Sequence, residues 1–271
     1  MYQLITLDMD GTLLNEEKLI TEGCKKAMHE AYLQNKYVVI ATGRAISELE
    51  DYRKDFDDVT YVIAESGALV YDYKNDKVLA KDCFDAKDVE TIYALSKKQD
   101  IMIQWFMDGQ AYVFDDQLHR LADYEMGMYQ QLFEDSSNPI FDLDAFMEEN
   151  KHSIEKMNLY HRTVEGRMRT YDDARDIDVD KVFAEITSVE FSPKGVHKGK
   201  GLVTLCEYLG VDVSKTISVG DSYNDIKIME TAGLAVAMKN SKPEVLELAD
   251  VVVSDCDHDG CAEAIYQYLL K

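Results

Sequence analysis

Apolar segments of strand length alternate with helical patterns at both ends of this 271-residue chain. In the helical patterns, apolar residues recur every three or four positions. The N-terminal part predicts a strand at 3–7, a helix at 21–34, a strand at 37–41, a helix at 46–53 and a strand at 61–64. Strands that alternate with helices in this way form parallel sheets. The sequence therefore predicts an α/β fold with a doubly wound, mainly parallel sheet.

The C-terminal part returns to the same alternation of strands and helices. Between the two parts, segments 68–73 and 78–81 flank a polar turn and predict a hairpin. The elements predicted near the C-terminus are a helix at 199–209, a strand at 216–219, a helix at 225–231, a strand at 234–237, a helix at 243–248, a strand at 251–253 and a helix at 261–270.

The middle of the chain has a different pattern, in which helices mix with strands that look antiparallel. Asp108-Gly109, between strand-like segments 101–106 and 110–114, is a hairpin signal. Aromatic residues here, such as Trp105 and Tyr112, are interpreted as core packing more than as a pocket lining. We therefore expect an α+β domain at 85–187, inserted between core segments at 1–84 and 188–271.

The segment Asp8-Met9-Asp10-Gly11-Thr12-Leu13-Leu14 directly follows the first predicted strand. Successive strand residues point to opposite faces, so the side chains of Asp8 and Asp10 lean the same way. They do so beyond the carboxyl end of the strand, where open α/β sheets bind ligands. Paired acids suit Mg²⁺, which takes oxygen ligands. The alternative is an Asp-Gly turn that only closes the strand.

Three further motifs stand at strand or helix edges farther along the chain. Ala41-Thr42-Gly43-Arg44 ends the second strand, and Lys198 lies just before a predicted helix. Gly220-Asp221-Ser222-Tyr223-Asn224-Asp225 follows another strand. Each motif alone is weak evidence, because Gly-Asp turns and lysines near helix starts are common. Their order, with each at an element edge, indicates one phosphoryl-transfer site.

With these four motifs, the chain resembles the haloacid dehalogenase-like (HAD) hydrolases, specifically the Cof-type phosphatases that carry a large α/β cap. The resemblance covers essentially the whole length and includes the segment 232–240. It implies a Rossmann-like HAD core with the inserted α+β domain as a cap over the catalytic edge. It also implies a magnesium-dependent phosphomonoesterase that hydrolyses small phosphorylated metabolites, such as sugar phosphates, through an aspartyl-phosphate intermediate.

The resemblance also implies roles for particular residues. Asp8 is the expected nucleophile, and Asp10 is the expected acid and base, which requires Asp10 to be protonated at the first step. Mg²⁺ would bind Asp8, the Asp10 backbone carbonyl and Asp221, while Asp225 would act through water or orient Lys198. The residues expected to hold the phosphoryl oxygens are Met9, Thr42, Gly43, Lys198 and Asn224.

Several of these residues have a plainer alternative role. Thr42 and Asn224 are also suited to capping a following helix, and Asp225 to a first-turn helix charge. The motif around Asp221 departs from the family, because Ser222 stands where an asparagine is frequent. After the third strand, Ser66-Gly67 replaces the frequent Asn-Gly, which puts a substrate contact by that side chain in doubt.

Composition narrows the class of partner. A formal net charge of −23 disfavours nucleic acid and anionic membranes as partners. No apolar run approaches the ~20 residues of a membrane helix, and the first strand takes the place of a cleavable leader, so we expect a cytoplasmic protein. The five scattered cysteines contain no CxxC pair and are expected to be free thiols. The sequence does not specify an oligomeric state.

Two other functions stay open at this point. A phosphotransferase or mutase would pass the phosphoryl group to a sugar hydroxyl in place of water, and nothing in the four motifs excludes it. A non-catalytic phosphate-binding regulator could retain the fold, although both aspartates and the lysine are present.

Overall fold

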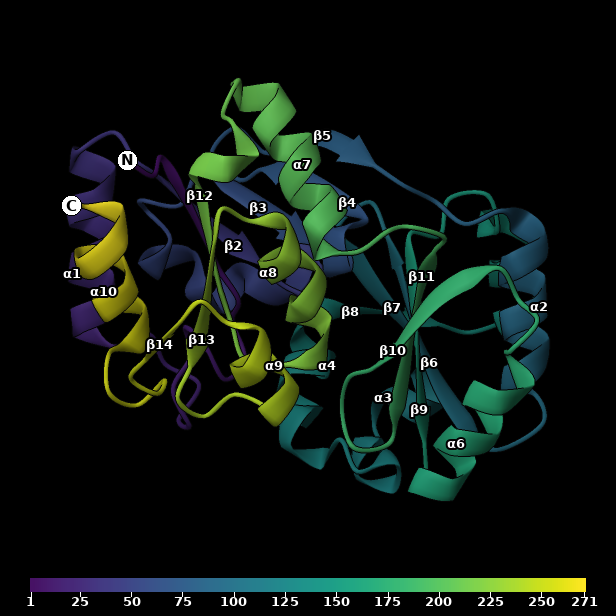
Figure 1. Ribbon diagram of the computed structural model, residues 1–271. Coiled ribbons are helices and arrows are strands. Elements are labelled where there is room, and N and C mark those ends of the chain that lie inside the picture. Colours follow the sequence, from purple (N-terminus) through teal and green to yellow (C-terminus); the bar gives the residue numbers. More distant parts are fainter. The chain divides into compact units, whose positions relative to one another are not determined.

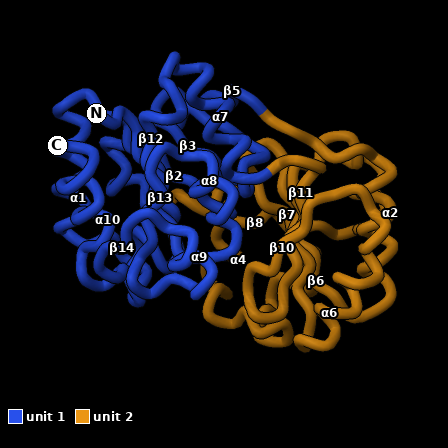
Figure 2. Tube along the Cα trace, in the orientation of Figure 1, with its two compact units in different colours: residues 1–43, 52–80, 197–271 blue, residues 44–51, 81–196 orange.

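The computed structural model describes residues 1–271 and divides them into two compact units. Unit 1 contains residues 1–43, 52–80 and 197–271. Unit 2 contains residues 44–51 and 81–196, so the second unit is an insertion into the first (Figure 2).

Unit 1 is built on an eight-stranded sheet with the order β14-β13-β12-β1-β2-β3-β4-β5. All neighbours from β14 to β3 are parallel, and β4 is antiparallel to β3. The strands are β1 (Leu4–Leu7), β2 (Tyr37–Ala41), β3 (Tyr61–Ala64), β4 (Leu69–Asp72), β5 (Lys77–Lys81), β12 (Thr216–Gly220), β13 (Leu234–Met238) and β14 (Val251–Val253).

Helices cover both faces of this sheet, as a doubly wound fold requires. Figure 1 shows α1 and α10 along one side and α7 and α8 along the other, and the members of each pair pack on one another. The expected α/β class is thus confirmed. The helices are α1 (Glu22–Leu33), α7 (Lys198–Leu209), α8 (Ile226–Thr231), α9 (Pro243–Leu248) and α10 (Gly260–Ala264), which continues as a π-helix at Ile265–Leu269.

Local sequence explains where the two longest helices of unit 1 begin and where α7 ends. The Thr21 side chain accepts a hydrogen bond from the Cys24 N–H and caps α1. The His197 ring caps α7 by accepting from the Lys200 N–H. Gly210 ends α7 with a φ of 68°, a left-handed conformation that glycine adopts without a Cβ penalty. The cap of α7 fixes Lys198 as its first residue.

Unit 2 is built on a six-stranded sheet with the order β10-β11-β9-β6-β7-β8, antiparallel except for the parallel pair β7 and β8. The strands are β6 (Ile101–Met107), β7 (Gln110–Phe114), β8 (Ser137–Ile140), β9 (Lys156–His161), β10 (Val179–Phe183) and β11 (Ser188–Pro193). The helices are α2 (Ala86–Ser96), α3 (Asp115–Leu118), α4 (Gln130–Ser136), α5 (Leu143–Asn150) and α6 (Val164–Asp173).

One core of unit 2 lies between its sheet and the helices α2, α5 and α6. Ile103, Trp105, Leu159 and Phe191 point into this core from alternate strand positions and are buried. Tyr112 packs against the same core. The interpretation of these aromatic residues as packing is therefore confirmed, and the α+β character of the insertion is as expected.

The boundaries of the insertion differ from the expected 84/85 and 187/188. The chain enters unit 2 at residue 81 and leaves it after residue 196. β11 pairs with β9 and β10, so it belongs to the sheet of unit 2. Residues 44–51 also group with unit 2, where the Ser47 N–H donates to the Gly109 carbonyl at 2.9 Å. The helix expected at 46–53 is a 3-10 helix at Ile46–Asp55.

None of the helices combines the length and the apolar character needed to cross a bilayer.

Candidate active site

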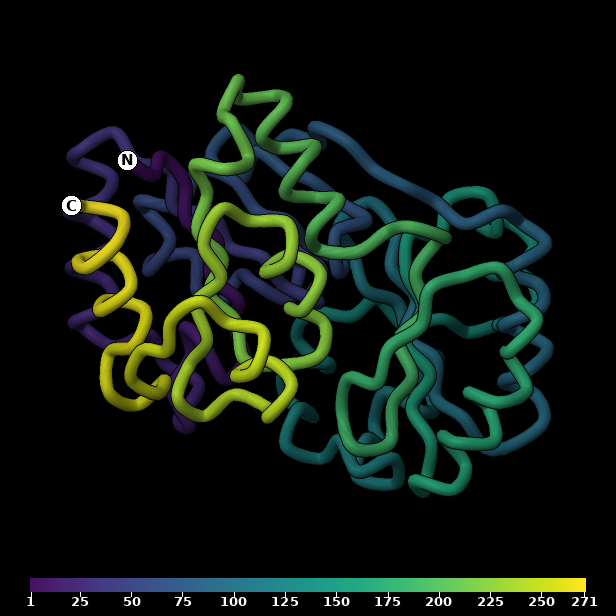
Figure 3. Tube along the Cα trace, viewed as in Figure 1, coloured from purple at the N-terminus to yellow at the C-terminus, as the bar shows by residue number.

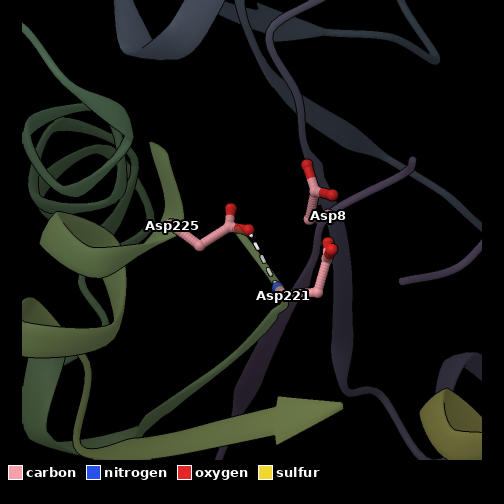
Figure 4. A group of neighbouring side chains, drawn as sticks. All are labelled: Asp8, Asp221 and Asp225. Carbon is pink, nitrogen blue, oxygen red and sulfur yellow. Dashed lines mark hydrogen bonds between the residues drawn. The ribbon is translucent and has the colours of Figure 1, made fainter. Parts of the chain in front are cut away.

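The carboxyl ends of β1 and β12 bring three aspartates together. The two strands are parallel, with Leu7 opposite Val219, so the residues that follow them emerge at one edge of the sheet. Asp8, Asp221 and Asp225 each place a carboxylate oxygen within 4.8 Å of the other two. Figure 4 shows the carboxylates of Asp8 and Asp221 beside each other, with that of Asp225 reaching toward them from the neighbouring turn.

A fully buried lysine completes this cluster. Lys198 Nζ lies 2.6 Å from Asp8 Oδ1 and 2.7 Å from Asp225 Oδ1. The second oxygen of Asp225 accepts hydrogen bonds from the N–H groups of Asp221 and Ser222 at 3.0 and 3.1 Å. Both Asp225 oxygens are thus engaged by protein donors. Asp225 thus contacts Lys198, as one of its two expected roles requires.

The cluster carries more negative charge than the protein neutralises. Three carboxylates and one ammonium give a net charge of −2 when all are ionised. Burial, reinforced by the charge of Asp225, raises the pKa of Asp8 well above its usual value. The same two causes raise the pKa of Asp221 to about 6. Asp8 and Asp225 are buried and Asp221 is half-buried, and such a set of oxygens with an excess charge suits a divalent cation.

The charge balance also explains why Lys198 stays an ammonium. Burial by itself lowers the pKa of a lysine, but the charges of Asp225 and Asp8 outweigh it and raise the pKa of Lys198 above its usual value. The protein therefore keeps one fixed positive charge beside Asp8.

Two residues that the sequence analysis missed hold the first motif in place. The Thr12 hydroxyl donates to Asp221 Oδ1 at 3.0 Å, and Lys18 Nζ pairs with Asp10 Oδ1 at 2.8 Å. Thr12 lies inside the first motif, so its place in the sequence could have indicated a role at the site. Lys18 was not detectable, because it reaches Asp10 only when the loop folds back through bridges from Leu14 to Asp10 and Ile20.

The Asp10 carboxylate is separate from the three-aspartate group. About a third of its side chain is exposed (32%), and it faces Lys18. The Met9 side chain before it is fully buried in the core. The structure thus gives Asp8 and Asp10 different surroundings, one buried among carboxylates and one at the surface of the unit.

The other expected phosphate-binding residues lie at the same sheet edge. Thr42 follows β2, the parallel neighbour of β1, and is buried. Its N–H donates to the Ile63 carbonyl at 2.8 Å, and its carbonyl accepts from the Ser66 N–H at 3.0 Å. Gly43 is half-buried next to it. These bonds tie the end of β2 to the turn after β3.

Asn224 is half-buried in the turn that also contains Asp225. The alternative role of Asn224 as a helix cap does not hold, because Ser222 forms the capping box with Asp225. Ser222, which stands where the family frequently has an asparagine, therefore caps this turn.

The turn at Glu65–Gly67 approaches the start of α7 closely. Gly67 has a φ of 101°, and a Cβ there would lie 2.2 Å from the His197 carbonyl oxygen and 2.8 Å from the Lys198 nitrogen. Glycine is thus required both by the backbone conformation and by the space that α7 occupies. This contact sets the position of the residue that carries the ammonium.

Gly67→Ala is expected to destabilise the protein by about 3 kcal/mol and to impair catalysis, because the main chain before Lys198 must move. Urea unfolding and steady-state kinetics measure the two effects. Gly210→Ala is the matched control, because Gly210 also has a positive φ but has open space around it, so only about 1 kcal/mol is expected. Equal losses for the two variants would show that the contact with α7 is unimportant.

Comparison with known proteins assigns the chain to a family. The family model for haloacid dehalogenase-like hydrolases matches residues 5–265. The chain is a haloacid dehalogenase-like hydrolase. The resemblance carried by the four motifs is thereby confirmed, and with it the expectation of a hydrolase.

Two relatives and one solved structure illustrate the similarity of this hydrolase to others. The putative phosphatase YxeH of Bacillus subtilis is 28% identical over 100% of this chain and 99% of its own. The pyridoxal phosphate phosphatase YbhA of Escherichia coli is 24% identical over 99% of each chain. The structure of a haloacid dehalogenase-like hydrolase from B. subtilis covers 98% of this chain and 99% of its own, with a TM-score of 0.86 and 22% identity. The hydrolase therefore shares its full-length fold with that structure.

Proposed function

We propose that this protein is an Mg²⁺-dependent phosphomonoesterase that hydrolyses small phosphorylated metabolites through an aspartyl-phosphate on Asp8. The observation that carries the proposal is the contact of Lys198 with Asp8 at 2.6 Å inside a buried cluster of net charge −2. Asp8 shares a fixed cation with Asp225, and the excess negative charge that remains suits a divalent ion. The names of the relatives, which are phosphatases, support the same activity.

Asp8 and Asp221 would hold the metal through their carboxylates, together with the backbone carbonyl of Asp10. Asp225 is left out, because both of its oxygens already accept hydrogen bonds from protein groups. Bound Mg²⁺ would neutralise charge on the phosphoryl oxygens, so that an anionic carboxylate can approach phosphorus. The uncompensated charge of the cluster is the feature that fits this ion.

In the first step, an Asp8 oxygen bonds to phosphorus while the bond from phosphorus to the leaving oxygen breaks. Asp10, which enters this step protonated and so no longer ion-paired with Lys18, gives its proton to that leaving oxygen. In the second step, Asp10 takes a proton from water as the water attacks phosphorus, which releases phosphate and restores Asp8. Lys18 sets the position of the Asp10 carboxylate before substrate binds.

The phosphoryl oxygens would be held by donors at the sheet edge. In this proposal they are the Met9 amide, the Thr42 hydroxyl, the Gly43 amide, the Lys198 ammonium and the Asn224 amide group. Preorganised donors of this kind stabilise the charge that develops in phosphoryl transfer. Lys198 is held in place by two buried carboxylate partners.

The proposal assigns substrate choice to unit 2, acting as a cap. Small phosphorylated metabolites, with sugar phosphates first, are the candidate substrates, and the cytoplasm is the proposed compartment. The relatives include a pyridoxal phosphate phosphatase and a 5-amino-6-(5-phospho-D-ribitylamino)uracil phosphatase, so both compounds belong in a test panel.

The test is phosphate release from a panel of sugar phosphates, pyridoxal phosphate, 5-amino-6-(5-phospho-D-ribitylamino)uracil and aryl phosphates in the presence of Mg²⁺. We expect at least one metabolite to reach a kcat/KM of about 10⁴ M⁻¹ s⁻¹ or more, and we expect EDTA to abolish the activity. Release that persists in EDTA, or no release from any compound, would contradict the proposal. Transfer of the phosphoryl group to an added sugar, in preference to water, would favour a phosphotransferase.

Mg²⁺ is expected to raise the melting temperature at about pH 7.5 and to raise it much less at about pH 5. Burial and the charge of Asp225 raise the pKa of Asp221 to about 6, so its carboxyl binds a proton across this interval only in the folded state. Without metal, that proton uptake stabilises the folded protein as the pH falls from about 6 to about 4. When Mg²⁺ is present, protons compete with it for the Asp221 carboxylate. Thermal shift assays at both pH values check this, and an equal shift at each would contradict it.

A further inference from the structure

The segment 44–51 directly follows two of the residues proposed to hold the phosphoryl group. Those residues, Thr42 and Gly43, belong to unit 1, whereas the segment groups with unit 2. β2 precedes the segment and β3 follows it, so the chain leaves unit 1 after residue 43 and returns to it at residue 52 (Figures 2 and 3). The position of this segment therefore acts on Gly43 through the main chain.

A buried carboxylate, that of Glu48, holds this segment to the sheet of unit 2. Glu48 is 4% exposed. Its Oε2 accepts a hydrogen bond from the Ala45 N–H at 2.7 Å, and its Oε1 accepts from Gln104 Nε2 on β6 at 2.9 Å. Ala45 lies two residues beyond Gly43. Glu48 thus connects the main chain just after the phosphate-binding motif to β6.

Further contacts fasten the segment to the hairpin formed by β6 and β7. The Ser47 N–H donates to the Gly109 carbonyl at 2.9 Å, and the Ala111 N–H donates to Ser47 Oγ at 3.4 Å. The Ala45 side chain packs with Phe106 and Ala111. These contacts fix where the segment lies on unit 2, and the buried carboxylate fixes the main chain that leads back to the motif.

A chain of buried hydrogen bonds continues from Gln104 across the sheet of unit 2. Gln104 Oε1 accepts from the Tyr160 hydroxyl at 2.9 Å, and the Tyr160 oxygen accepts from Asn158 Nδ2 at 3.0 Å. Asn158 Oδ1 is buried and has no hydrogen-bond partner. If both amide groups turned over, Tyr160 would donate to Asn158 Oδ1 and Gln104 would present its oxygen to residue 48. The chain can therefore accommodate either an acceptor or a donor at that position.

We propose that Glu48 is a positioning residue for the phosphoryl group, a role that rests on the proposed function. By joining Ala45 to Gln104, Glu48 sets the place of the Gly43 amide, one of the donors proposed for the phosphoryl oxygens. Without Glu48, the main chain after Gly43 would have to be ordered when phosphate binds, and this ordering would weaken binding. A carboxylate is costly to bury, and burial raises the pKa of Glu48, so a purely structural position would favour an apolar side chain.

The test measures the binding of inorganic phosphate to the full-length protein with Mg²⁺, by calorimetry at a temperature where circular dichroism shows each variant folded. Glu48→Met keeps the length of the side chain but removes both acceptor oxygens, and we expect phosphate to bind about ten-fold more weakly. Gln104→Met removes the partner on β6 and should weaken binding in the same direction, which provides a second variant if Glu48→Met does not fold. Glu48→Gln keeps an oxygen for the Ala45 N–H, and its NH₂ can donate to a turned-over Gln104, so we expect binding within about two-fold of the natural protein.

Thr170→Val is the matched control for a loss of buried hydrogen bonds elsewhere in unit 2. The Thr170 hydroxyl on α6 is hydrogen-bonded to His161 Nε2 at 2.8 Å and accepts from Gln99 Nε2 at 3.3 Å. This variant should melt at a lower temperature but bind phosphate as the natural protein does. Unchanged phosphate binding in both Glu48→Met and Gln104→Met, or an equal loss in Thr170→Val, would overturn the proposal.

Steady-state kinetics separate this role from the proposed function. Every substrate carries the phosphoryl group, so Glu48→Met is expected to lower kcat/KM by about the same factor, roughly ten-fold, for each substrate of the panel. A loss confined to some substrates would indicate that Glu48 contacts the rest of the substrate, and would overturn the positioning role. A natural protein that binds phosphate but releases none from any compound would contradict the proposed function alone, and one that binds no phosphate would overturn both.

Discussion

Asp8→Asn is expected to reduce phosphate release by on the order of 10⁴-fold or more, because removing a nucleophile alone removes almost all of the catalysis that depends on it. An amide oxygen is a poor nucleophile, and it also replaces one of the two carboxylates proposed to hold Mg²⁺. The side chain keeps its size, so the fold is expected to persist.

The same variant makes a prediction about stability. Asp8 is buried with Asp225 and Asp221 nearby, and its pKa is raised well above the usual value, first by burial. Neutralising it removes one like charge and leaves Lys198 with Asp225. We therefore expect the metal-free variant to melt at or above the temperature of the natural protein, and we expect its melting temperature to respond less to Mg²⁺.

Kinetics and thermal unfolding, each with and without Mg²⁺, test the expected loss of activity and the expected change in melting temperature. Asp116→Asn is the control, because Asp116 is an exposed carboxylate in unit 2. It should leave both activity and the Mg²⁺ response unchanged. An Asp8→Asn enzyme with near-normal turnover would show that another group attacks phosphorus.

Lys198→Met is expected to lower both stability and activity. Methionine has a similar length but no charge, so Asp8 and Asp225 would face each other in a buried site without the ammonium that now lies 2.6 and 2.7 Å from them. Removing one member of a buried ion pair costs about 3–5 kcal/mol. Losing a preorganised donor to the phosphoryl group costs about 10²–10³-fold in kcat.

Mg²⁺ is expected to restore part of the stability that Lys198→Met loses, because the ion also compensates the carboxylate charge. Lys215→Met, at an exposed lysine of the same unit, is the control and should lie within about 0.5 kcal/mol of the natural protein. A Lys198→Met protein as stable as this control would mean that Lys198 does not hold the carboxylates together.

The layout of the candidate site was predictable because it follows from chain direction. In parallel strands, residues that come directly after each strand gather at one edge, so Asp8, Thr42 and Asp221 could be placed together from the sequence. The same argument did not reach Lys18. Its contact with Asp10 depends on how an irregular loop folds back, and no periodic pattern records that.

The boundaries of the insertion were harder to predict than its existence. β11 is a buried strand like those of unit 1, and its short sequence does not record which sheet it joins. Its pairing with β9 and β10 decides that. Residues 44–51 likewise have a helical pattern but group with unit 2 through hydrogen bonds such as that from Gln104 to Glu48 at 2.9 Å. Contacts between segments that are distant in the sequence decide which unit β11 and residues 44–51 belong to.

The central claim is that Asp8 becomes phosphorylated during turnover, and chemical trapping tests it most directly. The enzyme is mixed with Mg²⁺ and a good substrate, quenched in acid within one turnover and treated with borohydride, which reduces an acyl phosphate to an alcohol. Peptide mass spectrometry is expected to find homoserine at position 8, and not in enzyme quenched without substrate. Reduction at Asp10 or Asp221, with none at Asp8, would contradict the account.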